Sequence, residues 1–360
     1  MQVDPGSVAR STLIPAAALA IAALLVAGAR ARAASAAVPA APVGPSTQVQ
    51  FSDYSPLSAS AEIMRRLLSP LTAAEVERSL ERSHERLSEQ SIDLAAERFA
   101  LYVPAQAPRD GYALLTFVAP WDEAWLPEGW APVLERHGMI FVSAARSSNR
   151  ADPIGRREPL ALLATYNVMQ RYRVNPERVY IGGFSGGARM ALRLALAYPD
   201  LYRGALLNAG SDPLDAGPPS PPPRELLERF QEGTRIVYLT GKYDALHLAM
   251  DSASEDSMRD WCVYDVAAEV THGASHEIAS AAALSRALTA LATHVRAEPA
   301  KLAACRAAID RRLAARLAEV RSLIDAGKRP EAAKRLEELD RRFGALAAPQ
   351  SLALAAQLSP

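Results

Sequence analysis

Four glycines flank a single serine, Ser185, in the stretch VYIGGFSGGARM at residues 179–190. An apolar run precedes this cluster, and the helical pattern ARMALRLALAY follows it. Because glycine has no side chain, a strand and a helix can approach closely across the turn that joins them. The stretch predicts either a serine nucleophile exposed on a strained strand-to-helix turn or a tight turn without chemistry. Residues elsewhere in the chain must decide between the two.

Apolar runs and helical patterns alternate on both sides of this turn. Strands are predicted in ERFALYVPA, YALLTFVAP, MIFVSAA, RVYIGG, GALLNAG, RIVYLTG and VYDVAAEV. Helices are predicted at 158–172, 187–198, 223–231 and 248–260. The turn signal PRDG between the first two runs predicts a hairpin or adjacent strands there. Such alternation indicates an α/β fold, in which helices cover both faces of a mostly parallel sheet and ligands bind beyond the carboxyl ends of the strands.

The ends of the chain differ from this α/β domain, which we place at residues 55–297 and which begins with helices. Residues 1–33 combine an early arginine, an apolar run and small residues, the layout of a signal peptide for secretion or transfer to the periplasm; an uncleaved membrane anchor is the alternative. Residues 34–54 are rich in alanine and proline and predict a flexible linker. Residues 298–360 predict a helical extension with a tetratricopeptide-like hairpin, which could contact another protein.

Charge and cysteine content limit the classes of partner. Acidic and basic residues balance at 40 each, so the chain has no net positive charge that would attract a nucleic acid or an anionic membrane surface. We expect neither as a stable partner. In an exported protein, Cys262 and Cys305 could form one disulfide, or both could remain buried thiols. Two cysteines without suitably spaced histidines do not predict a structural zinc site.

A serine hydroxyl is a poor nucleophile near neutral pH, so it needs a base, and the base needs an acid that orients it. In folds with this serine turn the chain order is serine, acid, histidine, each after a later strand. Asp244, just beyond RIVYLTG, is the predicted acid. Asp212, after the preceding strand, and Asp251 are the alternatives, although an aspartate before proline often serves to form a turn.

His276, directly before the helical segment EIASAAALSRALTAL, is the predicted base. His272 is an alternative base in the same loop, and His247, which lies close to Asp244 in sequence, is a further alternative base. His272 and His276 could also be read as metal ligands four residues apart, but Gly273 between them argues against the continuous helix that would align them. We therefore predict neither a metal site nor a cofactor.

A serine nucleophile of this kind also needs N–H donors that stabilise the oxyanion. The N–H of Gly186, at the start of the helix, is the predicted first donor. The second should come from the loop after ALLTFVAP, which continues WDEAW. Pro120 has no N–H, which leaves Trp121 or Asp122, and we predict Trp121.

Three motifs, in the expected order, carry a resemblance to a known family. NPERVYIGGFSGGARMALRLALAYPDLYRGALLNAG, YLTGKYD and GASHEIASAAALSRAL resemble α/β-hydrolases of the polyhydroxybutyrate-depolymerase and feruloyl-esterase-like group. The resemblance covers residues 97–291, more than half of the chain, and the first motif is the most specific. It implies an α/β-hydrolase fold.

The resemblance implies a serine esterase that cleaves small or polymeric carboxylic esters through an acyl-serine intermediate, with Ser185, His276 and Asp244 as the triad. It also implies that Asn149 lies near the substrate, and we expect Phe184 there as well. The chain departs from similar proteins in the loop after ALLTFVAP, which lacks their usual glycine. Two alternatives stay open: a binding protein with this fold and impaired catalysis, and a serine peptidase of the same fold.

Overall fold

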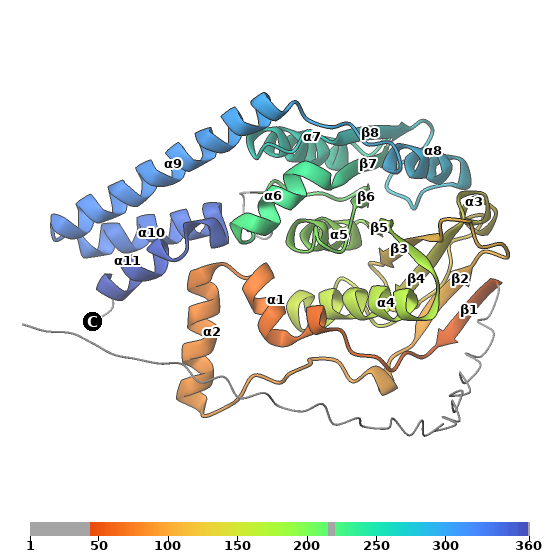
Figure 1. The fold of residues 1–360 in the computed structure, drawn as a ribbon, viewed down its shortest axis with the longest axis horizontal. Coiled ribbons are helices and arrows are strands. Elements are labelled where there is room, and N and C mark those ends of the chain that lie inside the picture. The colour runs from red at the N-terminus through yellow and green to blue at the C-terminus, as the bar shows by residue number, and fades with distance from the viewer. Residues whose placement is uncertain (1–43, 215–219, 359–360) are drawn as a thin grey trace, which may run out of the picture. The chain divides into compact units, whose positions relative to one another are not determined.

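The computed structural model describes residues 44–214 and 220–358, and its centre is an eight-stranded sheet (Figure 1). The strand order is β1-β2-β4-β3-β5-β6-β7-β8. All neighbours from β4 to β8 run parallel, whereas β2 is antiparallel to both β1 and β4. The strands are β1 Gly44–Val49, β2 Phe99–Val103, β3 Tyr112–Val118, β4 Met139–Ala144, β5 Val174–Phe184, β6 Gly204–Asn208, β7 Arg235–Gly241 and β8 Val266–Thr271. The proposed signal peptide, residues 1–33, lies outside the described residues.

Two sequence predictions are wrong at the antiparallel edge of the sheet. Part of the expected linker forms β1, because the outer edge of β2 offers unpaired backbone groups and pairing with them does not depend on side chains. Phe51, also assigned to the linker, is buried and packs against Phe99 with ring centroids 4.7 Å apart. The expected hairpin of β2 and β3 does not form, since the fully buried β4 pairs with both and lies between them.

Helices cover both faces of the sheet, as the alternating pattern predicts. The α/β domain contains α1 Ser60–Leu67, α2 Pro70–Ser83, α3 Ala131–His137, α4 Glu158–Arg171, α5 Gly186–Ala197, α6 Arg224–Gly233, α7 Ala245–Asp260 and α8 Ala281–Leu291. The apolar side chains of α3 and α8 pack together on one face. Those of α4, α5, α6 and α7 pack on the other, where α1 joins them. The central strands are therefore buried on both sides, which explains their continuous apolar sequences.

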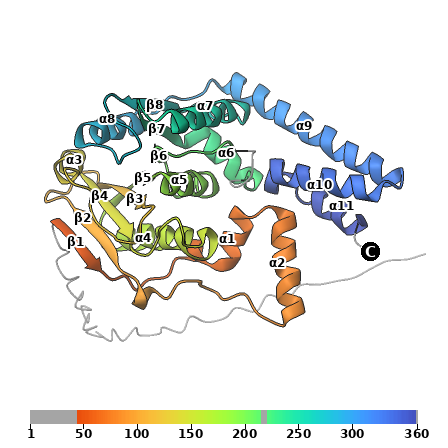
Figure 2. The ribbon, with the colours of Figure 1, turned by 180° about the vertical axis from the view of Figure 1, so that it is seen from behind.

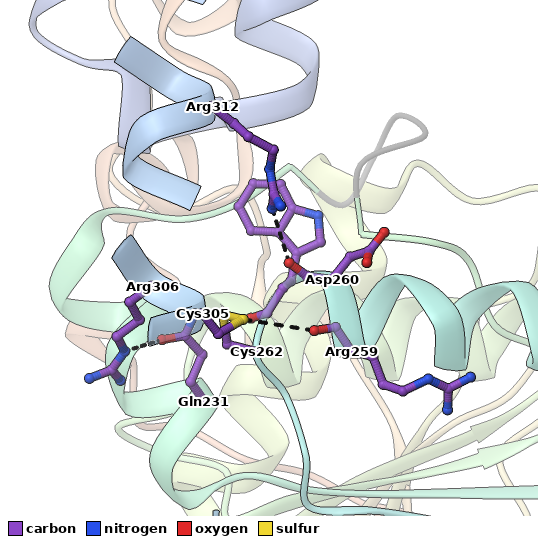
Figure 3. Close-up of a disulfide and its surroundings, with 8 residues drawn as sticks. Gln231, Arg259, Asp260, Cys262, Cys305, Arg306 and Arg312 are labelled. Atoms are coloured by element: carbon purple, nitrogen blue, oxygen red, sulfur yellow. Dashed lines mark hydrogen bonds between the residues drawn. A yellow bond between two sulfur atoms is a disulfide. The ribbon is translucent and has the colours of Figure 1, made fainter. Parts of the chain in front are cut away.

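The C-terminal segment folds into α9 Pro299–Asp325, α10 Arg329–Phe343 and α11 Gln350–Leu358, next to α2 (Figures 1 and 2). Of the two states left open for the cysteines, the structure contains the disulfide, which joins Cys262 after α7 to Cys305 in α9 (Figure 3). Arg306 adds a hydrogen bond of 2.6 Å to Gln231. The buried apolar side chains of these helices belong to one cluster with those of α6 and α7, so the extension packs on the α/β domain. No helix in the described part of the chain is long and apolar enough to cross a membrane.

Candidate active site

Ser185 lies between β5 and α5 in the conformation that the glycine cluster predicts. Its φ of 55° and ψ of −124° are unusual for a residue with a side chain. Backbone hydrogen bonds hold it there: its N–H donates to Asn208 O at 2.8 Å, and its carbonyl accepts from the N–H groups of Ala188 at 3.0 Å and Arg189 at 3.4 Å. The strain at this serine is thus maintained by the neighbouring strand and by the first turn of α5.

Two glycines allow α5 to begin this close to the sheet. A Cβ on Gly187 would lie 1.9 Å from the carbonyl oxygen of Val118, at the carboxyl end of β3. A Cβ on Gly186 would lie 2.2 Å from the side-chain oxygen of Asn149. The first contact is with rigid backbone, so glycine is required at 187, whereas the second is with an exposed side chain that can move away from a Cβ at 186.

A continuous hydrogen-bonded chain joins the serine to the predicted histidine and aspartate. His276 Nε2 lies 3.0 Å from Ser185 Oγ, and His276 Nδ1 lies 2.7 Å from Asp244 Oδ2. Asp244 follows β7 and is the N-cap of α7, while His276 stands in the loop after β8. A carboxylate can only accept from Nδ1, so Nδ1 carries the proton and Nε2 is left to accept from the serine hydroxyl.

The local environment keeps Asp244 charged. Its burial, with 7% of the residue exposed, acts to raise the pKa. Hydrogen bonds from His247 and His276 outweigh this effect and hold the pKa of the carboxyl below its usual range. Asp244 is therefore ionised at neutral pH and can stabilise a positive charge on His276.

The other acids are engaged elsewhere. Asp251 is buried and accepts 2.6 Å hydrogen bonds from Ser211 and Thr240, and burial raises its pKa. Asp212 forms an ion pair of 3.5 Å with Arg189, and burial raises its pKa too. Neither carboxylate is hydrogen-bonded to a histidine ring within the described residues. Both alternatives to Asp244 are thus placed outside the serine–histidine chain.

His272 and His247, the alternative bases, occupy different environments. His272 is exposed and takes no part in the chain. His247 Nδ1 lies 2.8 Å from Asp244 Oδ1, and its ring stacks on that of His276 with centroids 4.2 Å apart and planes 14° apart. Sequence reasoning placed His247 near the acid but missed this contact. A signal was present, because His247 follows Asp244 by three residues, a spacing that places side chains side by side at the start of a helix.

Asp244, His247 and His276 could also offer three metal ligands, since one ligand atom from each lies within 4.8 Å of the others. Their geometry suits a metal poorly. A ring-nitrogen lone pair lies in the plane of its ring, and two rings stacked 14° from parallel direct their lone pairs side by side rather than at one point. Zinc needs both nitrogens to converge at about 2.0–2.1 Å. The arrangement fits hydrogen bonding to one carboxylate better.

The loop after β3 lies against the serine turn through the contact of Val118 with Gly187. Pro120 O accepts from the N–H of Asn149 at 3.1 Å, so the N–H of Trp121, in the same trans peptide, points the opposite way. Neither this N–H nor that of Gly186 has a protein acceptor among the described residues. Both predicted oxyanion donors are therefore without a hydrogen bond in the described part of the protein.

Aromatic rings continue from this loop to the histidine. Trp121 stacks on the exposed Trp125 with centroids 5.1 Å apart and lies 6.1 Å from Phe184. Phe184 is half-buried, and its ring lies 4.9 Å from that of His276. Asn149 is exposed and packs its amide on Gly186. Phe184 and Asn149, predicted to bind substrate, thus both lie beside the serine turn.

Residues 160–295 match the family model of phospholipases and carboxylesterases. No curated protein matches the chain. Similar solved structures include an S-formylglutathione hydrolase from Staphylococcus aureus (14% identity, 55% of this chain, 93% of that chain, TM-score 0.43) and a ferulic acid esterase (14%, 54%, 92%, 0.42). An esterase from Thermogutta terrifontis is 16% identical over 56% of this chain and 88% of its own, with a TM-score of 0.40. Identities this low say nothing about substrate.

The strand order, the serine on its turn between β5 and α5 and the family match together confirm the predicted fold. The chain has the α/β-hydrolase fold.

Proposed function

We propose that this α/β-hydrolase-fold chain is a serine hydrolase that cleaves carboxylic esters through an acyl-serine intermediate. The observation that carries the proposal is the unbroken chain of hydrogen bonds from Ser185 Oγ through His276 to Asp244. A strained serine at a helix N-terminus, paired with a histidine that a buried carboxylate orients, has the parts that nucleophilic acyl transfer requires.

Each residue has one role in the proposed mechanism. His276 Nε2 accepts the hydroxyl proton as Ser185 Oγ attacks the ester carbonyl, and the ionised Asp244 stabilises the imidazolium that forms. The N–H groups of Gly186 and Trp121 would then bind the oxyanion. His276 returns the proton to the leaving alcohol, and water attacks the acyl-serine by the same route in reverse.

We propose that Phe184 and Asn149 line the substrate site from two sides of the serine turn. Phe184 offers an apolar ring in contact with His276, and Asn149 offers a polar amide beside Gly186. This combination suits an ester with one apolar group and one polar group. Substitution of Asn149 should change KM more than kcat, whereas substitution of Phe184 should change both, because its ring also contacts the His276 ring.

We also propose that the protein acts after export. The layout of residues 1–33 supports this, and so does the disulfide, because disulfides persist mainly in oxidising compartments. When the full chain is expressed, the protein should be recovered outside the cytoplasm with its N-terminus near residue 34. A cytoplasmic protein that keeps Met1 would contradict export, and an intact chain in the membrane fraction would favour an anchor.

The decisive experiment is labelling with a fluorophosphonate, which reacts with activated serines. Wild type should label at Ser185, Ser185→Ala should not label, and His276→Ala should label about 10³-fold more slowly or less. His272→Ala removes an exposed histidine from the same loop and should label like wild type. Failure of wild type to label would refute the proposed enzyme and favour a binding protein.

A matched substrate pair separates an esterase from a peptidase. A p-nitrophenyl ester and a p-nitroanilide of the same acyl group differ only in the leaving group. We expect turnover of the ester, and hydrolysis of the anilide at a comparable kcat/KM would instead indicate a peptidase. Esters of increasing chain length would then define the apolar group.

A further inference from the structure

Asp244 receives hydrogen bonds from two histidine rings, one on each carboxylate oxygen. His276 Nδ1 lies 2.7 Å from Oδ2, and His247 Nδ1 lies 2.8 Å from Oδ1. The backbone N–H of His247 also donates to Oδ1, at 3.3 Å. His247 is fixed by its place in the first turn of α7, for which Asp244 is the N-cap. The mechanism proposed above uses only one of these two rings.

His247 also supports the His276 ring directly. The two rings are nearly parallel, with centroids 4.2 Å apart, and Phe184 contacts His276 at 4.9 Å. His276 stands in a loop and is partly exposed, so its own backbone does little to fix the ring. A ring in such a loop needs neighbours to hold its orientation, and His247 and Phe184 are those neighbours.

We propose that His247 is a positioning residue: its Nδ1–H holds Asp244 Oδ1, and this bond aims Oδ2 at Nδ1 of His276. The inference rests on the proposed function, because it assigns how the acid of that triad is oriented. His247 is hydrogen-bonded to the acid and not to Ser185, so it does not replace His276 as the base. It fixes rotation of the carboxylate, which the bond from His276 and the longer backbone bond of 3.3 Å would leave freer.

The hydrogen bond and the ring of His247 can be removed separately. In His247→Asn the side-chain Nδ2–H stands close to the position of Nδ1 and keeps the donor, but the ring is lost. In His247→Phe an aromatic ring remains and the donor is lost. If the bond positions Asp244, the Asn variant should rescue what the Phe variant loses.

A second histidine provides a matched control. His294 Nδ1 lies 2.8 Å from Asp265 Oδ2, the same contact in a part of the fold away from Ser185. Arg235 also binds Asp265, which marks this pair as structural. His294→Phe therefore measures what loss of a histidine–aspartate hydrogen bond does to the fold without touching the proposed triad.

The first readout is steady-state ester hydrolysis. We expect His247→Phe to lower kcat about tenfold with KM within about twofold of wild type, as for loss of a charge-assisted hydrogen bond. His247→Asn should keep kcat within about threefold, and His294→Phe should lower the melting temperature without lowering kcat. The inference is overturned if His247→Phe keeps full kcat, if both His247 variants are equally impaired, or if His294→Phe lowers kcat as much.

The second readout does not depend on turnover. A proton shared between imidazole and carboxylate resonates far downfield in the proton NMR spectrum, and the His276–Asp244 proton should do so in wild type and in His247→Asn. In His247→Phe this resonance should move upfield or disappear, and an unchanged resonance would overturn the inference. A wild type that keeps the resonance but does not label at Ser185 would refute the proposed function alone.

Discussion

Substitution of Gly187 by alanine tests whether the close approach of α5 to β3 sets the geometry of the site. The new Cβ would lie 1.9 Å from Val118 O, whereas real Cβ atoms essentially never come within 3.0 Å of such an atom. The start of α5 must therefore move by about 1 Å. Such overpacking typically costs about 1–3 kcal/mol of unfolding free energy. The backbone of β3 resists displacement, because Val118 pairs with Gly183 of β5 and the preceding residues pair with β4 as well.

The same shift acts on the chemistry. Ser185 directly precedes α5, and its Oγ lies 3.0 Å from His276 Nε2. A displacement of about 1 Å breaks this hydrogen bond, and misplacement on that scale can cost about 10²-fold in rate. We expect Gly187→Ala to label with fluorophosphonate about 10²-fold more slowly than wild type and to melt several degrees lower.

Gly186→Ala is the matched control one residue away. Its Cβ would meet the exposed side chain of Asn149, which can rotate, rather than backbone. We expect its stability to stay within about 0.5 kcal/mol of wild type and its labelling within about threefold. The reasoning is refuted if Gly187→Ala melts and labels like Gly186→Ala, because the clash would then have no structural consequence.

Two further predictions concern stability. Substitution of both Cys262 and Cys305 by alanine removes a cross-link between residues 43 apart in the sequence. From the loop entropy we expect the free energy of unfolding, measured with denaturant, to fall by about 4 kcal/mol, while labelling at Ser185 stays unchanged. An unchanged free energy of unfolding would contradict this. A hydrogen bond from Arg65 is the main cause that lowers the pKa of Glu62 from 4.5 to about 2, so the native state binds this proton less readily than the unfolded chain. The contribution of the Glu62 carboxylate to the free energy of unfolding is then complete above pH 4.5 and is lost as the pH falls toward 2. Over that window the melting temperature of Glu62→Gln should change less with pH than the melting temperature of wild type.

Local sequence accounts for the centre of the fold and for the order of the site residues. The glycines around Ser185 admit a strained turn, and continuous apolar runs predict buried parallel strands. Because the carboxyl ends of parallel strands meet at one edge of a sheet, residues that follow different strands are brought together there. Asp244 and His276 could be chosen on these grounds, and the structure joins His276 to the serine and Asp244 to His276.

Tertiary structure decided what pairing between distant segments controls. The sequence between β2 and β3 carries a turn signal, yet β4 separates them, since strand order depends on which buried surfaces fit together. The edge strand β1 pairs through its backbone, which leaves little trace in side chains. The disulfide needed the start of α9 to approach the end of α7, a distance that no spacing in the chain determines.

The same limit applies within the site. Three histidines were candidates for the base, and sequence order favoured His276 over His272 and His247 without predicting that His247 binds the acid. Both rings bind Asp244, because the loop after β8 passes over the first turn of α7 and each carboxylate oxygen meets a different ring. The sequence determined which residues reach this edge of the sheet. Only the packing of the loop after β8 on α7 decided that the His276 ring bonds to Ser185 and that the His247 ring bonds to the other oxygen of Asp244.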